Sequence, residues 1–298
     1  MAVKIAAILA IYRHTQAIDL THAMTNPTQS FQPPRILVFD SGVGGLSVAR
    51  EIQQRLPLNP LVYASDNAFF PYGTKGEAEL IARVDQVIGE LLLRYPADIL
   101  VIACNTASTL TLPHLRSKLS LPIVGVVPAI KPAALMSKSG VIGLLATPAT
   151  VARPYTHELI REYATNCQVI SLGSSELVQI AEQKLRGEAI DVNAIGRIVQ
   201  ELVHADQAEK MDVLVLACTH FPLLKDELVQ HLPEQIKLID SGAAIARRVE
   251  FLLADAAEPH VGYVPEHLAV FTKATTAAEQ LSPALTGFGI HQQAYLNI

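Results

Sequence analysis

The chain has 298 residues, of which 50% are hydrophobic and 17% are charged, so it is long enough to bury a large core in one or two domains. Its formal net charge of −5 argues against nucleic acid or an anionic membrane surface as the main partner. Three widely spaced cysteines fit neither a disulfide framework nor a zinc site, which predicts a reducing, cytoplasmic compartment and no bound metal.

Residues 1–34 come before the first organised segment and are predicted to form a disordered leader. The apolar run 5–11 is at the short limit for a secretory signal, and no convincing small-residue cleavage site follows it. Translation from Met1 and translation from Met24 both stay open. No later stretch approaches the ~18 uninterrupted apolar residues that a transmembrane helix requires, so we expect no membrane attachment.

The first predicted strand, 36–39, leads into a glycine-rich turn, 40–45, with the sequence DSGVGG. The glycine spacing does not match a dinucleotide fingerprint, and the carboxylate of Asp40 would repel a phosphate. A small cationic or zwitterionic ligand suits the turn better. The alternative, glycines that only make a strand-to-helix turn, stays open.

A second strand, 61–64, is followed by a loop, 66–75, that contains Pro71-Tyr72-Gly73. A loop with aromatic residues, proline and glycine after a strand is a candidate wall for a pocket, although such a sequence is also an ordinary turn. Apolar residues at helical spacing then predict a helix over 77–94.

Two later segments repeat one pattern. In 99–108 an apolar run ends at Cys104 and breaks into small polar residues, and in 213–222 the same happens at Cys218. A continuous apolar run of this length is typical of a strand buried on both faces, as in parallel sheets. Ligands bind at the carboxyl ends of such strands, so we expect the two thiols to face one site. After Ser108 we expect a helix with Pro113 near its start.

The other predicted strands are 123–127, 141–146, 169–172 and 236–239, and the other predicted helices include 174–186 and 193–205. Strands alternating with helices predict an α/β fold with mainly parallel sheets. Pro128 and Pro132 suggest a stiff crossover between lobes. The stretch 240–242 repeats Asp-Ser-Gly, so we expect two similar lobes related by pseudo-twofold symmetry, with the active site in the cleft between them.

The predicted domain limits follow from these repeats. The first lobe is expected to comprise residues 35–126 with about 240–253, and the second to comprise 127–239 with the C-terminal tail.

Four motifs, taken in order, resemble the glutamate racemases of the cofactor-independent aspartate/glutamate racemase superfamily. They are 40–45 (DSGVGG), 71–73 (PYG), 103–108 (ACNTAS) and 217–222 (ACTHFP), and the match covers about residues 36–253. The stretches 127–132 and 240–248 resemble the enterobacterial type. The segment 175–179 lacks the prolines that many relatives have there.

The resemblance implies a role for each matching position. Cys104 would take the α-proton of D-glutamate with help from Asp40, and Cys218 that of L-glutamate with help from His220 and Glu182. The residues that would bind the amino and carboxylate groups of the substrate are Asp40, Ser41, Tyr72, Gly73, Asn105, Thr106, Thr147, Thr219 and His220.

The chemistry of the two thiols points to the same reaction. Inverting a stereocentre by proton transfer needs one base on each face of the α-carbon. A free thiol has a pKa of about 8.5, and a strand-end or helix-N-terminal position is expected to lower it. With the α-carbon between the two sulfurs, these atoms should stand roughly 7 Å apart. No lysine-centred motif suggests pyridoxal phosphate, and the superfamily works without it. Cys167 is assigned to ordinary core packing.

Three other functions stay open: a racemase for aspartate or another amino acid, a single-thiol enzyme such as a decarboxylase, and a two-lobed amino-acid binding protein without chemistry. The resemblance further implies that the chain supplies D-glutamate for peptidoglycan. The enterobacterial likeness implies a UDP-muramyl peptide precursor as activator, bound at the lobe junction near 128–132.

Overall fold

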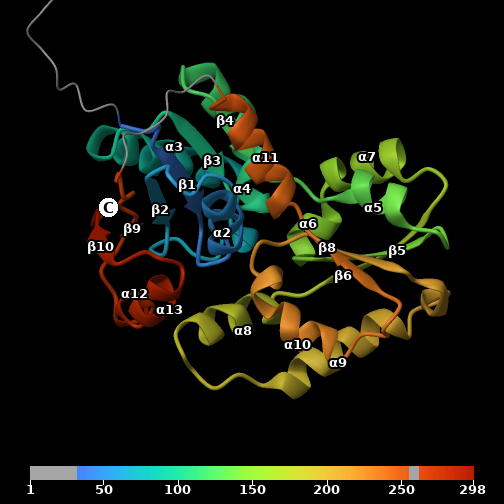
Figure 1. The fold of residues 1–298 in the computed structure, drawn as a ribbon. Helices are drawn as coiled ribbons and strands as arrows, with labels where there is room; N and C mark the ends of the chain where they lie inside the picture. Colours follow the sequence, from blue (N-terminus) through green and yellow to red (C-terminus); the bar gives the residue numbers. More distant parts are fainter. Residues whose placement is uncertain (1–31, 255–261) are drawn as a thin grey trace, which may run out of the picture.

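The computed structural model describes residues 32–254 and 262–298. The predicted leader, except for its last three residues, and the choice between Met1 and Met24 lie outside the described residues. Two sheets, each made only of parallel strands, form two lobes side by side (Figure 1), so the predicted α/β class is confirmed. No helix in the described part of the chain is long and apolar enough to cross a bilayer.

The first sheet has six strands in the order β10-β9-β2-β1-β3-β4. Their bounds are β1 Ile36–Asp40, β2 Leu61–Ser65, β3 Ile99–Ile102, β4 Ile123–Gly125, β9 Leu268–Phe271 and β10 Gln292–Tyr295. Strands β1, β2 and β3 are buried along their whole length because helices cover both faces. Alternate residues of β1 serve opposite faces: Ile36 and Val38 pack in one core, and Leu37 and Phe39 in the other.

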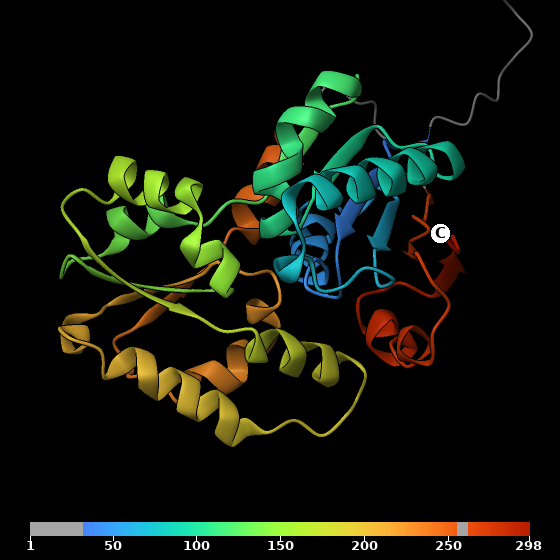
Figure 2. The ribbon, with the colours of Figure 1, turned by 180° about the vertical axis from the view of Figure 1, so that it is seen from behind.

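The helices of the first lobe divide between these two cores. On one face lie α2 (Leu46–Arg55) and α11 (Gly242–Leu252), and on the other lie α3 (Glu77–Arg94) and α4 (Asn105–Lys118). Seen from behind, α3 and α4 run across the strands (Figure 2). The bounds of α3 are those predicted. The prediction for α4 is wrong: the amide of Ser108 already donates to the carbonyl of Cys104, so the helix begins directly after Cys104 and Pro113 lies in its interior.

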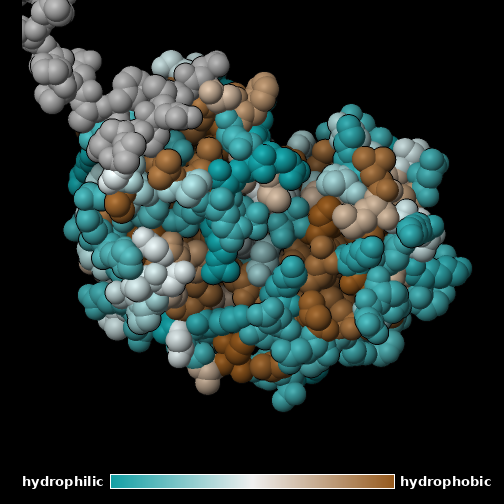
Figure 3. Space-filling model, viewed as in Figure 1, coloured by the Kyte–Doolittle hydropathy of each residue, from teal (hydrophilic) through white to brown (hydrophobic). Residues whose placement is uncertain are grey.

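The second sheet has four strands in the order β6-β5-β7-β8. Their bounds are β5 Val141–Ala146, β6 Gln168–Gly173, β7 Val213–Leu216 and β8 Lys237–Ile239. The surrounding helices are α5 (Ile130–Met136), α6 (Pro148–Ala152), α7 (Pro154–Tyr163), α8 (Glu176–Leu185), α9 (Val192–Val203) and α10 (Lys225–Val229). The face seen in Figure 3 is largely hydrophilic, and the apolar residues exposed on it gather mainly over the second lobe.

The chain crosses between lobes twice. It leaves the first lobe through residues 126–129, between β4 and α5, and returns through 240–241, between β8 and α11. The hydroxyl of Ser241 donates to the carbonyl of Val127, so the two crossings are joined. Pro128 lies in the first crossing as predicted, while Pro132 lies inside the first turn of α5.

The predicted place of the C-terminal tail is wrong. Strand β9 pairs with β2 and β10 pairs with β9, so both extend the first sheet. The short helices α12 (Thr276–Glu279) and α13 (Ser282–Gly287) pack on the first lobe as well. Without β9 the edge of β2 would present unpaired backbone groups, and the tail covers that edge. The lobes therefore share an architecture but differ in size.

Candidate active site

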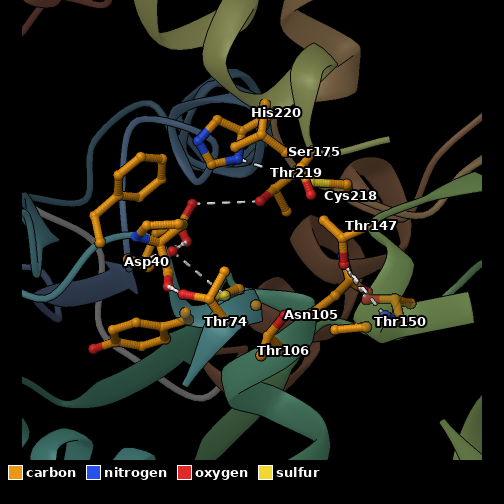
Figure 4. Close-up of a pocket in the computed structure, with 18 of the residues that line it drawn as sticks. Asp40, Thr74, Asn105, Thr106, Thr147, Thr150, Ser175, Cys218, Thr219 and His220 are labelled. Carbon is orange, nitrogen blue, oxygen red and sulfur yellow. Dashed lines mark hydrogen bonds between the residues drawn. The ribbon is translucent and has the colours of Figure 1, made fainter. Parts of the chain in front are cut away.

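A cavity of about 220 Å³ lies between the two lobes. Figure 4 shows side chains of both lobes converging on it from the carboxyl ends of the strands, where ligands of α/β sheets bind. Eleven of the twelve predicted site residues line it. They are Asp40, Ser41, Tyr72, Gly73, Cys104, Asn105, Thr106, Thr147, Cys218, Thr219 and His220.

Cys104 and Cys218 come from different lobes and line this one cavity as free thiols. They are similarly enclosed, with 7% and 8% of their surface exposed. A disulfide between the two cysteines, or positions on separate surfaces, would exclude a two-base reaction. The structure shows neither arrangement. Cys167 lies outside the cavity and packs partly buried against the second lobe's core.

Cys104 stands between the end of β3 and the first turn of α4. Its Sγ lies 3.7 Å from the hydroxyl of Ser41. Burial raises the pKa of the Cys104 thiol strongly, and the negative charge of Asp40 raises it further, while the backbone N–H of Ala107 and the hydroxyl of Ser41 oppose this. The expectation that the helix N-terminus leaves this thiol with a lowered pKa is therefore wrong, because burial outweighs the helix.

Asp40 is completely buried at the end of β1 and accepts hydrogen bonds from both lobes. The Ser41 backbone N–H donates at 2.6 Å and its hydroxyl at 3.3 Å, Gly45 N–H donates to the other oxygen, and Thr219 Oγ1 of the second lobe donates at 3.3 Å. Burial raises the pKa of this carboxyl, although the charge of His220 and the backbone donors pull it back. Asp40 thus links the two halves of the site.

Cys218 stands at the end of β7, with His220 two residues further on. Its Sγ lies 3.8 Å from His220 Nδ1, and the other ring nitrogen lies 2.8 Å from Glu182 Oε1. Burial alone lowers the pKa of His220, but hydrogen bonds to Cys218 and Glu182 and their charges outweigh burial and raise the pKa well above 6.5. A protonated imidazole therefore sits beside the sulfur, within reach to pass a proton to it or to take one from it.

Glu182 is the predicted site residue that does not line the cavity. It lies behind His220, and the same oxygen accepts a hydrogen bond of 2.8 Å from the backbone N–H of Val43 in the first lobe. It can therefore act on the cavity only through the imidazole, while it also joins the two lobes.

The glycine-rich turn makes room for the second lobe. A Cβ on Gly42 would collide with Glu182 Oε1, and a Cβ on Gly44 would collide with His220 Nδ1. Backbone approach to protein side chains, more than to a ligand, therefore requires glycine at these two positions.

Two short segments face each other across the cavity. The first is the 3₁₀ turn η1 (Tyr72–Thr74), and the second is α6, which Thr147 caps by accepting from the Thr150 backbone N–H at 3.3 Å. A Cβ on Gly73 would lie 3.9 Å from the Cβ of Ala149. The hydroxyl of Tyr72 donates to Asp66 at 2.7 Å, so the backbone of this residue is what remains for a ligand.

The sequence interpretation did not single out several lining residues, among them Thr74, Thr150, Ser175, Val178 and Gln179. The last three stand at helical spacing with Glu182, so all four share one face of α8, and that periodicity is the signal that could have found them. In the described ranges, 32–254 and 262–298, no three His, Cys, Asp or Glu side chains gather as metal ligands.

Comparison with known proteins gives consistent matches. The family model described as Asp/Glu/Hydantoin racemase matches residues 46–249. The glutamate racemase of Salmonella typhimurium is 52% identical over 262 residues, which is 88% of this chain and 92% of that protein. The Pectobacterium atrosepticum glutamate racemase is 50% identical over 258 residues, covering 87% and 90%.

Two solved structures are similar over most of the chain. The Escherichia coli glutamate racemase, solved in complex with L-glutamate and the activator UDP-MurNAc-Ala, matches with a TM-score of 0.83 at 48% identity, covering 89% of this chain and 98% of that one. A glutamate racemase isoform from Bacillus anthracis matches with a TM-score of 0.73 at 30% identity, covering 88% and 97%.

Proposed function

Because the chain belongs to the Asp/Glu/Hydantoin racemase family, as the resemblance of its motifs predicted, we propose that it interconverts L- and D-glutamate with Cys104 and Cys218 as its two bases. The observation that carries this proposal is the arrangement of the thiols. Two free cysteines, each at the end of an interior strand of a different lobe, line one cavity.

Each thiol acts on one face of the substrate. Cys218 removes the α-proton of L-glutamate while Cys104 delivers a proton to the opposite face, and the roles reverse for D-glutamate. With the α-carbon at a near-attack distance from both, the sulfurs stand roughly 7 Å apart in the closed complex. The carbanion between the two transfers is the species that the site must stabilise.

The polar residues of the cavity hold the substrate. The buried Oδ1 of Asn105 has no hydrogen-bond partner, and this suits it to accept from the substrate ammonium. Backbone N–H groups at the start of α4 face the same region and suit a carboxylate. We assign binding of the amino and carboxylate groups to Asp40, Ser41, Tyr72, Gly73, Asn105, Thr106, Thr147, Thr219 and His220.

Each thiol has its own assistant. Asp40 assists Cys104 through the hydroxyl of Ser41, which contacts both. His220 assists Cys218 directly, and Glu182 is a positioning residue that fixes the imidazole. The reaction needs neither pyridoxal phosphate nor a metal, because closure of the lobes around the substrate excludes water and lets these fixed dipoles support the carbanion.

The biological role follows from the reaction. D-glutamate is a component of bacterial peptidoglycan, so we assign the chain to cell wall synthesis in the cytoplasm, where thiols stay reduced. The Escherichia coli racemase was solved with UDP-MurNAc-Ala as activator, and at 48% identity we propose that a UDP-muramyl peptide precursor also activates this chain, at the junction near residues 128–132.

The test is incorporation of solvent deuterium at the α-carbon of each enantiomer without added cofactor. The wild type should exchange and invert both. Cys104→Ser should lose inversion and still exchange the α-proton of L-glutamate, and Cys218→Ser should still exchange that of D-glutamate. The same experiment with aspartate separates the nearest alternative. Glutamate binding without any exchange, with and without the precursor, would leave a binding protein.

A further inference from the structure

A buried ion pair lies behind the wall of the cavity. The carboxylate of Asp66, at the end of β2, is completely buried and takes no part in lining the cavity. Arg83 of α3 donates to both of its oxygens, with Nε at 2.9 Å and Nη2 at 2.6 Å. Thr272, directly after β9, donates its hydroxyl at 2.7 Å. A carboxylate removed from water needs such partners, and a guanidinium fork supplies two in fixed geometry.

The fourth donor to Asp66 is the hydroxyl of Tyr72, at 2.7 Å. Tyr72 is 1% exposed and opens turn η1, whose three residues all line the cavity. Its ring packs in the same core as Cys104. Arg83, through Asp66, therefore fixes the buried side chain of Tyr72, with which this wall begins.

The position of the wall sets the width of the cavity. Gly73 of η1 faces Ala149 of the opposite lobe closely, so a small displacement of the turn changes the space left for a ligand. The tail of the chain takes part in this anchoring: besides the bond to Asp66, Thr272 Oγ1 accepts from the Ala68 backbone N–H at 3.1 Å.

We propose that Arg83 is a positioning residue for the reaction: through Asp66 and Tyr72 it holds turn η1 at the distance from α6 that glutamate binding requires, and Thr272 of the C-terminal tail supports it. The inference rests on the proposed racemase function. Since the wall contacts the substrate before and during proton transfer, its displacement weakens ground-state and transition-state binding alike, which raises KM and leaves kcat nearly unchanged.

The experiment compares Arg83→Gln, Arg83→Lys and Thr272→Val with Arg55→Gln, which removes an exposed ion pair with Glu250 in the same lobe. KM and kcat are measured in both directions per folded molecule. Arg83→Gln should raise KM about tenfold and change kcat by less than about threefold. Arg83→Lys keeps the positive charge, so its KM should return most of the way to the wild-type value. Thr272→Val should raise KM about twofold, and Arg55→Gln should leave KM unchanged.

A merely structural ion pair gives a different result. Loss of folded protein lowers apparent kcat and leaves KM at the wild-type value, so an unchanged KM in Arg83→Gln overturns the inference. If Arg83→Gln does not fold, the same KM criterion applies to Arg83→Lys and Thr272→Val. L-glutamate affinity, measured by calorimetry, separates the two hypotheses: a wild type that binds without racemising contradicts the proposed function, while an Arg83 variant with unchanged Kd contradicts this inference alone.

Discussion

Strands β3 and β7 each deliver a cysteine to the cavity from an interior position of a sheet, yet the chain continues differently after each. After Cys104 it enters the 14-residue helix α4, whereas Cys218 is followed by a short turn that places His220 beside the sulfur. The neighbouring acid also differs. The acid near Cys104 is Asp40, and no histidine of the first lobe lines the cavity beside it. The acid in the second lobe is Glu182, which is hydrogen-bonded to His220.

This difference gives the two thiols different electrostatic surroundings. Burial and Asp40 raise the pKa of Cys104, so it rests as a protonated thiol. The raised pKa of His220 keeps a positive charge next to the sulfur of Cys218. The free enzyme then holds a protonated thiol on one face of the cavity and an imidazolium beside the other thiol. In the mechanism that we propose, Cys218 removes the α-proton of L-glutamate and Cys104 delivers a proton to the opposite face.

The largest expected effect tests whether each cysteine, with the residue that assists it, removes the α-proton of one enantiomer. His220→Asn should lower kcat/KM about 100-fold, and by the same factor in both directions, because enantiomers have equal free energy in water. The asymmetry should appear in primary isotope effects. With Cys218 impaired, proton removal from L-glutamate limits the rate, so L-[2-²H]glutamate should show a larger effect than the D form.

Asp40→Asn is the matched variant in the other half. Since we propose that Asp40 assists Cys104, this variant should give the larger isotope effect with D-[2-²H]glutamate. The same pattern of isotope effects in both variants would contradict the assignment of one assistant to each thiol.

The next prediction concerns the rate at which the two thiols are alkylated in the absence of substrate. At pH 7 iodoacetamide should alkylate Cys218 about tenfold faster than Cys104, because the thiolate is the nucleophile, the pKa of Cys104 is raised and the two thiols are about equally enclosed. Peptide mass spectrometry follows both, with Cys167 as internal reference. His220→Asn removes the positive charge beside Cys218 and should reduce the difference. Faster alkylation of Cys104 than of Cys218 in the wild type would contradict the raised pKa of Cys104.

Much of this comparison could be predicted from local sequence. An apolar run that ends in a cysteine marks a buried strand and its carboxyl end, so the convergence of Cys104 and Cys218 followed from two such runs and the rules of parallel sheets. The bounds of α3 followed from its apolar periodicity.

What could not be predicted depends on contacts between distant segments. Nothing in the run 268–271 tells which sheet it will join, and its partner β2 lies about 200 residues earlier, as the pairing of Val62 with Leu268 shows. The place of Glu182 behind His220 depends on how the lobes pack. The raised pKa of Cys104 required its burial, which a helix-start motif does not reveal.

The smallest expected effect is a different pH dependence of the unfolding free energy for His220 and for Cys104. A group whose pKa is raised on folding contributes stability that is complete below its unfolded pKa and is lost as pH rises through the folded pKa. For His220 that loss begins near pH 6.5, and for Cys104 it begins only near pH 9. Each group adds a slope of at most about 1.4 kcal/mol per pH unit to the fall in unfolding free energy.

Denaturant unfolding between pH 6 and pH 10 measures both windows. His220→Gln should flatten the fall that starts near neutral pH, and Cys104→Ser should flatten only the alkaline part. His114→Gln, which changes an exposed histidine paired with Asp85 in the first lobe, controls for the loss of a histidine outside the cavity. If His220→Gln and His114→Gln give the same curve, the imidazole beside Cys218 is not held protonated. That outcome would contradict the difference that we infer between the surroundings of the two thiols.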